Sequence, residues 1–289
     1  MRRQLREEPL SNHTSFRIGG PAAFYYEPET GEEIRDLLRH CKEEGIRTAV
    51  IGNGSNLLVG DKGFRGAVIR LGEGFGAIEV NGNRLTAEAG ALLAKLARTA
   101  ANAGLSGLAF AAGIPGTVGG ALVMNAGAYG GEMKDILESA ELLLPDGSVR
   151  RFTGAELELS YRHSNIPALG AIVLSATFVL TPGEKEEILA EMKRYAESRR
   201  EKQPLAFPSA GSAFKRPPGD TAARLLDEAG CKGLRIGGAA ISEKHAGFLV
   251  NLEHASAADV RAVLAAAAER VEARFGVRLE PEIRFLGEF

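Results

Sequence analysis

The spacing of apolar residues along the chain switches between the period of a helix and that of a strand, which predicts an α+β fold. Helical spacing extends over four long segments, 30–44, 91–104, 184–202 and 256–275. Two of them open with a capping pattern, because an acidic residue follows Thr30 and Ser256 by three positions. A shorter helix is predicted over 221–229, and runs of strand length lie between the helices.

Two hairpins are predicted from their turn residues. Asn81-Gly82 and Asp146-Gly147 each stand between runs rich in strand-forming residues. A two-residue hairpin turn favours residues that accept a positive φ, and these pairs do so. Further strands are predicted for 171–180 and for the closing segment 278–289.

A break in the pattern predicts a domain boundary near Lys202. Residues 203–220, with the sequence QPLAFPSAGSAFKRPPGD, contain four prolines and no regular period. We therefore expect one region over 1–201 and a second domain over 202–289.

Composition removes several function classes. The 289-residue chain has a formal net charge of −2, so no overall field draws it to nucleic acid or anionic lipid. No window has the ~18 apolar residues of a membrane span, and the N-terminal residues do not read as a signal peptide. Neither the two cysteines nor the five histidines have metal-ligand spacing, so we expect buried thiols and no metal site.

The loop GNGSNL, residues 52–57, is the first candidate binding feature. Gly52 and Gly54 allow backbone N–H groups to approach a bulky anion closely, and Ser55 and Asn56 add side-chain donors. A diphosphate fits such a loop. A tight turn without a ligand is the alternative.

The segment 112–132, AGIPGTVGGALVMNAGAYGGE, is the second. It has seven glycines among apolar residues, so it is expected to be buried and yet to leave room beside its backbone. A large buried cofactor explains both properties, and Asn125 would offer it an amide. Close packing of backbone on backbone is the alternative. Neither loop has the G-x-G-x-x-G pattern of a Rossmann dinucleotide site.

Basic residues gather around the boundary: Arg199, Arg200, Lys202, Lys215 and Arg216. They could meet an anionic ligand, or they could be solvated surface charge. Ser212 stands nearby in SAGSAFKRP, which is not the G-x-S-x-G pattern of a hydrolase.

Taken in order, these motifs resemble the UDP-N-acetylenolpyruvoylglucosamine reductases. The resemblance runs along nearly the whole chain through NHTSFRIGGPA (12–22), GNGSNLLV (52–59), AGIPGTVGGALVMNAGAYG (112–130), YRHS (161–164), KQP (202–204), AGSAFKRP (210–217), GGAAIS (237–242), HAGFLVN (245–251) and EPEIRFLG (280–287). Many collinear motifs are far more specific than any one of them.

The resemblance implies an α+β, PCMH-type FAD-binding region of two subdomains, split near residue 72, and a C-terminal α+β substrate-binding domain. It implies a cytoplasmic enzyme, expected to be a monomer, that uses NADPH and FAD to reduce UDP-N-acetylglucosamine enolpyruvate to UDP-N-acetylmuramate for peptidoglycan. The alternatives are another FAD-dependent oxidoreductase or oxidase of this fold, and a non-catalytic UDP-sugar-binding protein.

The resemblance also implies roles for individual residues. Ser212 would protonate the substrate, and Arg162 and Glu282 would be the other catalytic groups. The expected substrate-binding residues are Lys202, Lys215 and Arg216. The expected cofactor-binding residues are Gly52, Asn53, Gly54, Ser55, Asn56, Leu57, Ile114, Pro115, Gly116, Thr117, Gly119, Gly120, Asn125, Gly127, Ala128 and Arg199.

Three points depart from the family pattern or stay open. The family often has asparagine where this chain has Arg216. The insertion after "YR" that carries a substrate-closing tyrosine in longer members is absent, so the chain resembles the shorter subtype. Glu280 lies two residues from Glu282 on the same predicted strand, so spacing alone does not separate them.

Overall fold

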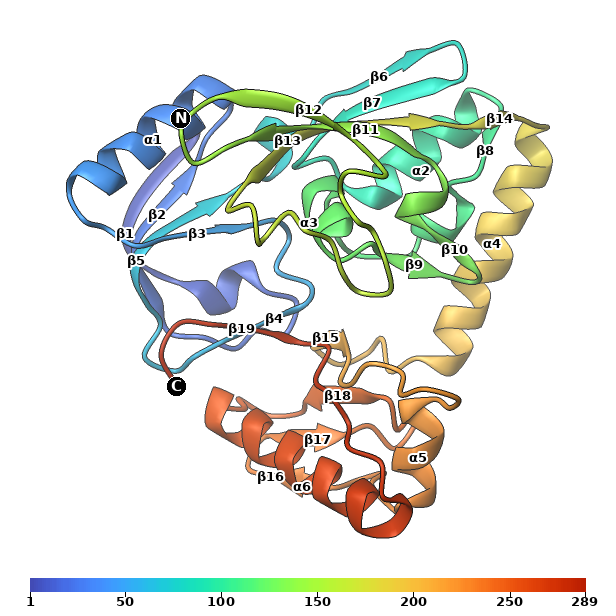
Figure 1. Ribbon diagram of the computed structural model, residues 1–289. Coiled ribbons are helices and arrows are strands. Elements are labelled where there is room, and N and C mark those ends of the chain that lie inside the picture. Colours follow the sequence, from blue (N-terminus) through green and yellow to red (C-terminus); the bar gives the residue numbers. More distant parts are fainter. The chain divides into compact units, whose positions relative to one another are not determined.

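The computed structural model describes all 289 residues and divides into two compact units, each made of three chain segments (Figure 1). Unit 1 comprises Met1–Leu5, Tyr25–Asn53 and Ala67–Ser198, and unit 2 comprises Arg6–Phe24, Gly54–Gly66 and Arg199–Phe289. The boundary falls inside strands β1 (Arg3–Pro9), β2 (Pro21–Glu27) and β5 (Phe64–Arg70). The division at residue 202 stays a prediction, and the compact units are not continuous stretches of chain.

Unit 1 is built on a five-stranded antiparallel sheet of order β12-β11-β13-β7-β6. Its strands are β6 (Ile78–Asn81), β7 (Arg84–Glu88), β11 (Leu137–Leu143), β12 (Val149–Thr153) and β13 (Ile172–Val179). Helix α3 (Val118–Val123) packs on β13 and β7, and α2 (Leu93–Asn102) lies on the β6 side. In a smaller sheet, β3 (Thr48–Ile51) pairs in parallel with residues 67–70 of β5.

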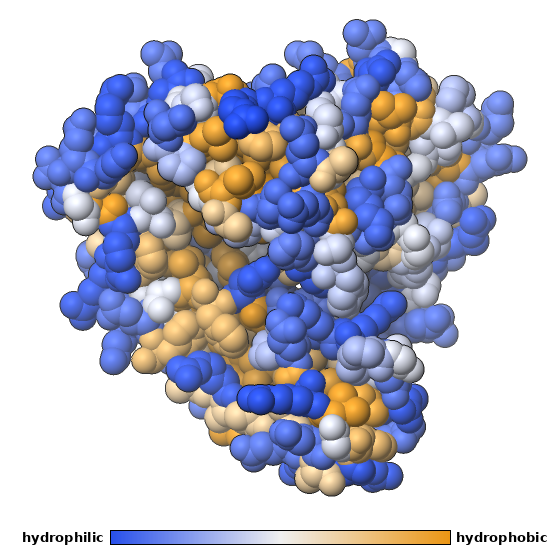
Figure 2. All heavy atoms as spheres, in the orientation of Figure 1, coloured by the Kyte–Doolittle hydropathy of each residue, from blue (hydrophilic) through white to orange (hydrophobic).

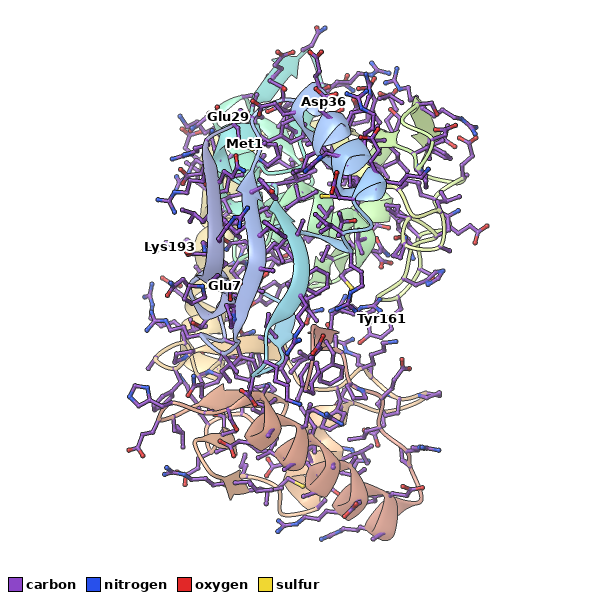
Figure 3. All side chains as sticks on the ribbon, turned by 90° about the vertical axis from the view of Figure 1, so that its left-hand side faces the viewer. Met1, Glu7, Glu29, Asp36, Tyr161 and Lys193 are labelled. Atoms are coloured by element: carbon purple, nitrogen blue, oxygen red, sulfur yellow. The ribbon has the colours of Figure 1, made fainter.

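Short strands and one long helix complete unit 1. The two-residue strands are β8 (Leu105–Ser106), β9 (Gly127–Ala128), β10 (Gly131–Glu132) and β14 (Thr181–Pro182). The N-terminal amine of Met1 pairs with Glu29 and Glu33, and Met1 and Glu29 lie together in Figure 3. Helix α4 (Lys185–Lys202) leaves unit 1 after Ser198.

The predicted helices are present, but they differ in how much they bury. Helix α1 (Gly31–Glu43) starts at Thr30, whose hydroxyl accepts a hydrogen bond from the Glu33 N–H at 3.1 Å. It buries its apolar stripe and shows hydrophilic residues outward in Figure 2. The expected apolar side of helix α4 is covered in part: Ile188 is buried, and Leu189, Met192 and Tyr195 are half-buried. Charged residues surround its apolar positions, and most of its surface stays exposed.

Both hairpins are confirmed, and one turn is shifted. Asn81 pairs with Arg84, so the two-residue turn is Gly82-Asn83, one position later than predicted. Gly82 supplies the positive φ, +60°. In the second hairpin Leu143 pairs with Val149, and Gly147 has a φ of +83°.

Unit 2 contains a four-stranded sheet of order β15-β18-β17-β16. Its strands are β15 (Ser209–Ser212), β16 (Arg235–Ile236), β17 (Ala239–Ile241) and β18 (Phe248–Asn251), and its helices are α5 (Ala222–Glu228) and α6 (Ala257–Phe275). The predicted capping box of Ser256 and Asp259 starts α6. Val260, Val263 and Val271 on α6 join a buried core with Phe16 and Leu58.

Two segments from the first quarter of the chain are built into unit 2. Strand β4 (Leu57–Val59) pairs in parallel with β19 (Arg284–Leu286). The carboxylate of Asp61 accepts hydrogen bonds from the N–H groups of Ala257 and Ala258, at 2.8 and 3.1 Å, which satisfies two of the four open donors at the start of α6. These long-range bonds carry no sequence signal, which is why the interleaving was not foreseen.

Both cysteines, Cys41 and Cys231, are buried free thiols, as expected. Burial raises the pKa of each thiol. None of the helices combines the length and the apolar character that crossing a membrane requires.

Candidate active site

The first glycine loop belongs to both units, because the boundary falls between Asn53 and Gly54. In unit 1 the amide of Asn53 donates to the carbonyl of Pro115 at 2.7 Å, which joins the two predicted cofactor loops. A Cβ on Gly52 would lie 2.2 Å from the hydroxyl oxygen of Thr117. Glycine at 52 is therefore required by Thr117 itself.

Thr117 carries the clearest sign of a missing partner. The residue is only 2% exposed, and its hydroxyl oxygen has no hydrogen-bond partner in the protein. A buried hydroxyl left unpaired costs about 1–3 kcal/mol. Thr117 was among the expected cofactor-binding residues, and a polar ligand group beside it would remove this cost.

In the unit 2 part of the loop, Gly54 is fixed by neighbouring backbone. Its φ is +62°, and a Cβ would lie 2.1 Å from the carbonyl oxygen of His13. The backbone N–H groups of Gly54, Ser55 and Asn56 donate to no protein carbonyl. Consecutive open amides of this kind suit an anionic ligand such as a diphosphate.

The side chain of Asn56 has a protein partner. Its side-chain amide donates to the carbonyl of Glu282 at 3.1 Å, and the backbone carbonyl of Asn56 accepts from the Arg284 N–H at 2.9 Å. One side-chain N–H expected for a ligand is therefore already bonded to protein. Asn56 instead connects the loop to the segment that carries Glu282.

In the segment 112–132, several glycines pack against protein. A Cβ would lie 3.0 Å from Ala89 at Gly119, 2.8 Å from the Gly131 carbonyl at Gly127, and 2.7 Å from Phe110 at Gly131. Gly120 is exposed, and the only contact that a Cβ there would make within 4 Å is with the Thr117 hydroxyl oxygen, at 3.7 Å. The close-packing explanation holds for the first three glycines, whereas space for a ligand remains beside Gly120 and Thr117.

Asn125 was expected to offer its amide to the cofactor, but that amide is bonded to protein groups of unit 1. Its nitrogen donates to the Glu132 carboxylate at 2.7 Å and to the Ser160 carbonyl at 3.1 Å, and its oxygen accepts from the Lys134 N–H at 2.9 Å. The residue is 0% exposed. Both N–H donors of the side chain are therefore used, and none is left to donate to a ligand.

Arg162 also lies in unit 1, in a tight turn formed by residues 160–163. Its guanidinium carbon is 5.0 Å from the centre of the Tyr161 ring, and the exposed Tyr161 is labelled in Figure 3. A cation over a tyrosine face is attracted to it and is held in a defined direction.

Ser212 and the segment around Glu282 are brought together in unit 2. Ser212 ends β15 opposite Phe248, after a turn in which the Ser209 hydroxyl is hydrogen-bonded to the Gly211 backbone. The next residue, Ala213, accepts a hydrogen bond from the Glu282 N–H at 3.0 Å. The predicted donor and one predicted carboxylate therefore stand on adjacent antiparallel segments.

The structure separates Glu280 from Glu282, which the spacing did not. The closing strand was expected to include both, but β19 covers only Arg284–Leu286. The Glu280 side chain is 71% exposed and pairs with the Lys215 ammonium at 2.5 Å. Glu282 is only half exposed, and its backbone is bonded on both sides, by Ala213 and Asn56.

The basic cluster has a structural explanation as well as a functional one. Arg199, Arg200 and Lys202 form the last turn of α4, where cations oppose the negative end of the helix dipole. Lys202 and Arg216 are exposed, whereas Lys215 and Arg199 are half-buried. Substrate and cofactor roles for these residues stay predictions, as do those of the flanking residues Leu57, Ile114, Pro115, Gly116 and Ala128.

Two features escaped the sequence reasoning. Ser164 is buried and bonds the carbonyl of Val123, and no motif marked it as more than part of YRHS. The positive φ of Arg162 has no sequence signal, because arginine rarely adopts it. The structure has no cluster of three His, Cys, Asp or Glu residues that could hold a metal ion.

Comparison with known proteins gives the family. Residues 203–286 match the C-terminal domain of UDP-N-acetylenolpyruvoylglucosamine reductase, and residues 22–153 match an FAD binding domain. The chain is 52% identical to the UDP-N-acetylenolpyruvoylglucosamine reductase of Agathobacter rectalis, over 99% of this chain and 94% of the relative. It is 48% identical to that of Enterococcus faecalis, over 98% and 94%.

A solved structure agrees with these matches. The crystal structure of the reductase from Thermus caldophilus superimposes with a TM-score of 0.84 at 40% identity, covering 98% of both chains. The expected α+β fold, with an FAD-binding region followed by the reductase C-terminal domain, is thereby confirmed. The chain belongs to the UDP-N-acetylenolpyruvoylglucosamine reductase family.

Proposed function

We propose that the protein is an FAD-dependent reductase that converts UDP-N-acetylglucosamine enolpyruvate to UDP-N-acetylmuramate in peptidoglycan synthesis. The observation that carries the proposal is the 52% identity to a reductase of that name over 99% of this chain. The unit 2 geometry supports it, since Ser212 and Glu282 stand on adjacent segments that are joined by a backbone hydrogen bond.

The residues present fit FAD. The unpaired, buried Thr117 hydroxyl would accept or donate one hydrogen bond, and the open amides of Gly54, Ser55 and Asn56 would hold the diphosphate. When bound, FAD supplies the hydride chemistry of the reaction, between NADPH and the substrate. The chain supplies binding, orientation and proton transfer.

Reduction of the enolpyruvyl group adds a hydride at C3 and a proton at C2. Negative charge builds toward the substrate carboxylate as the hydride arrives. We assign Arg162 and Glu282 to stabilise that charge, because a fixed guanidinium and an oriented carboxyl group act before the bond is made. We assign the C2 proton to the Ser212 hydroxyl, since the enolate formed by hydride addition is basic enough at C2 to take a proton from an alcohol.

The substrate's diphosphate needs cations, and we assign Lys202, Lys215 and Arg216 to it. Lys215 already pairs with Glu280, whose side chain is largely exposed. An exposed ion pair contributes about 0–1 kcal/mol, so a diphosphate can compete for this ammonium. Glu280 then acts on the charge of Lys215 and has no role in the chemistry.

The finer points belong to the same proposal. NADPH is the reductant and the protein works as a monomer. We place it in the cytoplasm, where NADPH and nucleotide sugars are made. The two buried free thiols agree with a reducing compartment.

The proposal is tested by following NADPH oxidation with and without UDP-N-acetylglucosamine enolpyruvate in the absence of oxygen. We expect oxidation only when the enolpyruvyl compound is present, with one UDP-N-acetylmuramate formed per NADPH. No oxidation with the enolpyruvyl compound, but NADPH oxidation once oxygen is admitted, would instead identify an oxidase of related fold. Binding of the UDP-sugar without any NADPH oxidation would identify a non-catalytic binding protein.

A further inference from the structure

The turn that presents Arg162 is strained. Residues 160–163 close a four-residue turn in which Ser160 and His163 exchange two backbone hydrogen bonds, both 3.1 Å long. Arg162 is the third residue of the turn and has a φ of +54°. A positive φ at this position characterises a type II turn, where glycine or asparagine is the usual residue. For arginine, the left-handed backbone conformation is less favourable than the right-handed one by about 1–2 kcal/mol.

Strain of this kind persists only where the surroundings impose it. Two buried side chains impose it here. The Asn125 amide donates to the Ser160 carbonyl, which opens the turn, at 3.1 Å. The Ser164 hydroxyl, one residue beyond the turn, donates to the Val123 carbonyl at 2.9 Å. The two residues that hold the turn from outside are Val123, the last residue of α3, and Asn125, in the segment that follows α3.

Asn125 is itself held in place, because both N–H donors of its amide are used and its oxygen also accepts a hydrogen bond. Its remaining bonds go to Glu132 and to the Lys134 N–H, so it cannot turn toward a ligand without breaking them. It is fully buried and also has a positive φ, +40°, which asparagine tolerates better than other non-glycine residues. Because the amide is held by Glu132 and Lys134, it fixes the position of the Ser160 carbonyl relative to the 125–134 loop.

We propose that Asn125 and Ser164 are positioning residues that hold the strained 160–163 turn, and thereby aim the Arg162 guanidinium at the substrate carboxylate. The inference rests on the proposed function, because it takes Arg162 as a catalytic residue. It also reassigns Asn125, which the resemblance suggested as a cofactor ligand. Neither side chain touches substrate or FAD in this account, and both act through Arg162.

The kinetic test is a double-mutant cycle on the rate at which the enolpyruvyl substrate reoxidises the reduced holoenzyme. We expect Asn125→Ala to slow this rate by about 10- to 100-fold, since a displacement of about 1 Å costs on that order. Ser164→Ala, a milder change, should slow it less. In the Arg162→Ala background either change should have less than about a twofold further effect, because the residues act as one unit.

Ser106→Ala is the matched control. Its hydroxyl makes a similar bond, to the Thr181 carbonyl at 3.0 Å, elsewhere in unit 1. It should leave the reoxidation rate and the flavin content unchanged. If Asn125→Ala does not fold, the Ser164→Ala arm carries the test.

The outcomes are distinguishable. If Arg162→Ala leaves reoxidation unchanged, the catalytic role of Arg162 fails and the inference fails with it. If Arg162→Ala slows it but the Asn125 and Ser164 changes add their full effects in that background, the proposed function stands and the inference alone is overturned. Loss of flavin from Asn125→Ala would return Asn125 to cofactor binding.

A second readout does not depend on activity. Arg162→Gly and Arg162→Ala remove the same side chain functions, but only glycine relaxes the positive φ. We expect the glycine variant to unfold about 2–4 °C above the alanine variant, since about 1 kcal/mol shifts the midpoint by that much in a protein of this size. Equal midpoints would show that the turn is not strained.

Discussion

The two proposed catalytic positions, Arg162 in unit 1 and Ser212 in unit 2, are presented by backbone in opposite ways. Arg162 itself has the positive φ, +54°, within a turn tied down by buried side chains. At Ser212 the positive φ, +81°, belongs to the preceding Gly211, where no atom lies within 4 Å of the missing Cβ. Unit 2 uses a residue that tolerates the conformation, whereas unit 1 imposes it on a residue that does not.

The difference follows from what each side chain must do. A serine hydroxyl is short, and a bulge in a regular strand pair is enough to place it, as the register shift between Ser209 and Ser212 shows. A guanidinium at the end of a flexible side chain needs its backbone, and its Tyr161 neighbour, to be fixed before it has a direction. The position of Arg162 in unit 1 should therefore depend on neighbouring side chains more than the position of Ser212 in unit 2 does.

The largest expected effect is on Ser212. Ser212→Ala should slow reoxidation by the enolpyruvyl substrate by about 10²–10⁴-fold, the usual contribution of a general acid. Flavin reduction by NADPH should stay near normal, because that half-reaction needs no proton at C2. Stopped-flow measurement of both halves checks this. Slowing of both halves, or loss of flavin, would make Ser212 a structural residue.

Substitution of each of the two glutamates in unit 2 separates a catalytic role from a charge effect on substrate binding. Glu282→Gln should slow reoxidation by about 10²-fold, the order expected when one charge-stabilising group is lost. Glu280→Gln should leave that rate unchanged. It should lower the substrate KM, because it releases Lys215 from its ion pair, and this effect should shrink with added salt. Equal losses in both variants would contradict the assignment.

Gly211→Ala tests the difference between the two units directly. It places in unit 2 a non-glycine residue with a positive φ, as Arg162 is in unit 1. The variant should lose about 1 kcal/mol of unfolding free energy. Gly276→Ala is the control, because Gly276 also has a positive φ, +67°, and open surroundings. Urea unfolding should give similar losses for both, with slowed reoxidation in Gly211→Ala alone. No loss in either would mean that these positions are not strained.

The smallest expected effect is the pH dependence carried by His245. Burial lowers the pKa of its imidazole, and its Nδ1 accepts a hydrogen bond from the Gly247 N–H at 3.1 Å. Below the unfolded pKa of about 6.5, the unfolded chain binds a proton that the folded protein resists. Stability should therefore fall as the pH drops below about 6.5. His245→Gln should flatten this part of the profile, and an unchanged slope would contradict the shift.

Much of the fold could be predicted from sequence because its signals are local. The Thr30 and Ser256 caps and the hairpin glycines act within a few residues of themselves. The Gly82-Asn83 turn was displaced by one position because either neighbour of Gly82 could complete the turn. The apolar side of α4 was also predicted from local spacing, but its depth of burial depends on tertiary contacts, and only Ile188 is fully buried.

The site was predictable as a set of residues and less so as an arrangement. Position in a motif suggested Asn125 as a ligand, and only the three bonds of its amide showed that it is already satisfied. The separation of Glu280 from Glu282 likewise depends on where β19 begins and on the Lys215 pair. Such facts depend on contacts between residues far apart in the chain, which no local pattern records.

The most direct test of the account follows the flavin itself. The purified protein should be yellow, with absorbance near ~450 nm from bound FAD. Without oxygen, NADPH should bleach it, and the colour should return when UDP-N-acetylglucosamine enolpyruvate is added, with UDP-N-acetylmuramate as the product. A flavin that stays bleached with this substrate and recovers only when oxygen is admitted would contradict the proposed reaction.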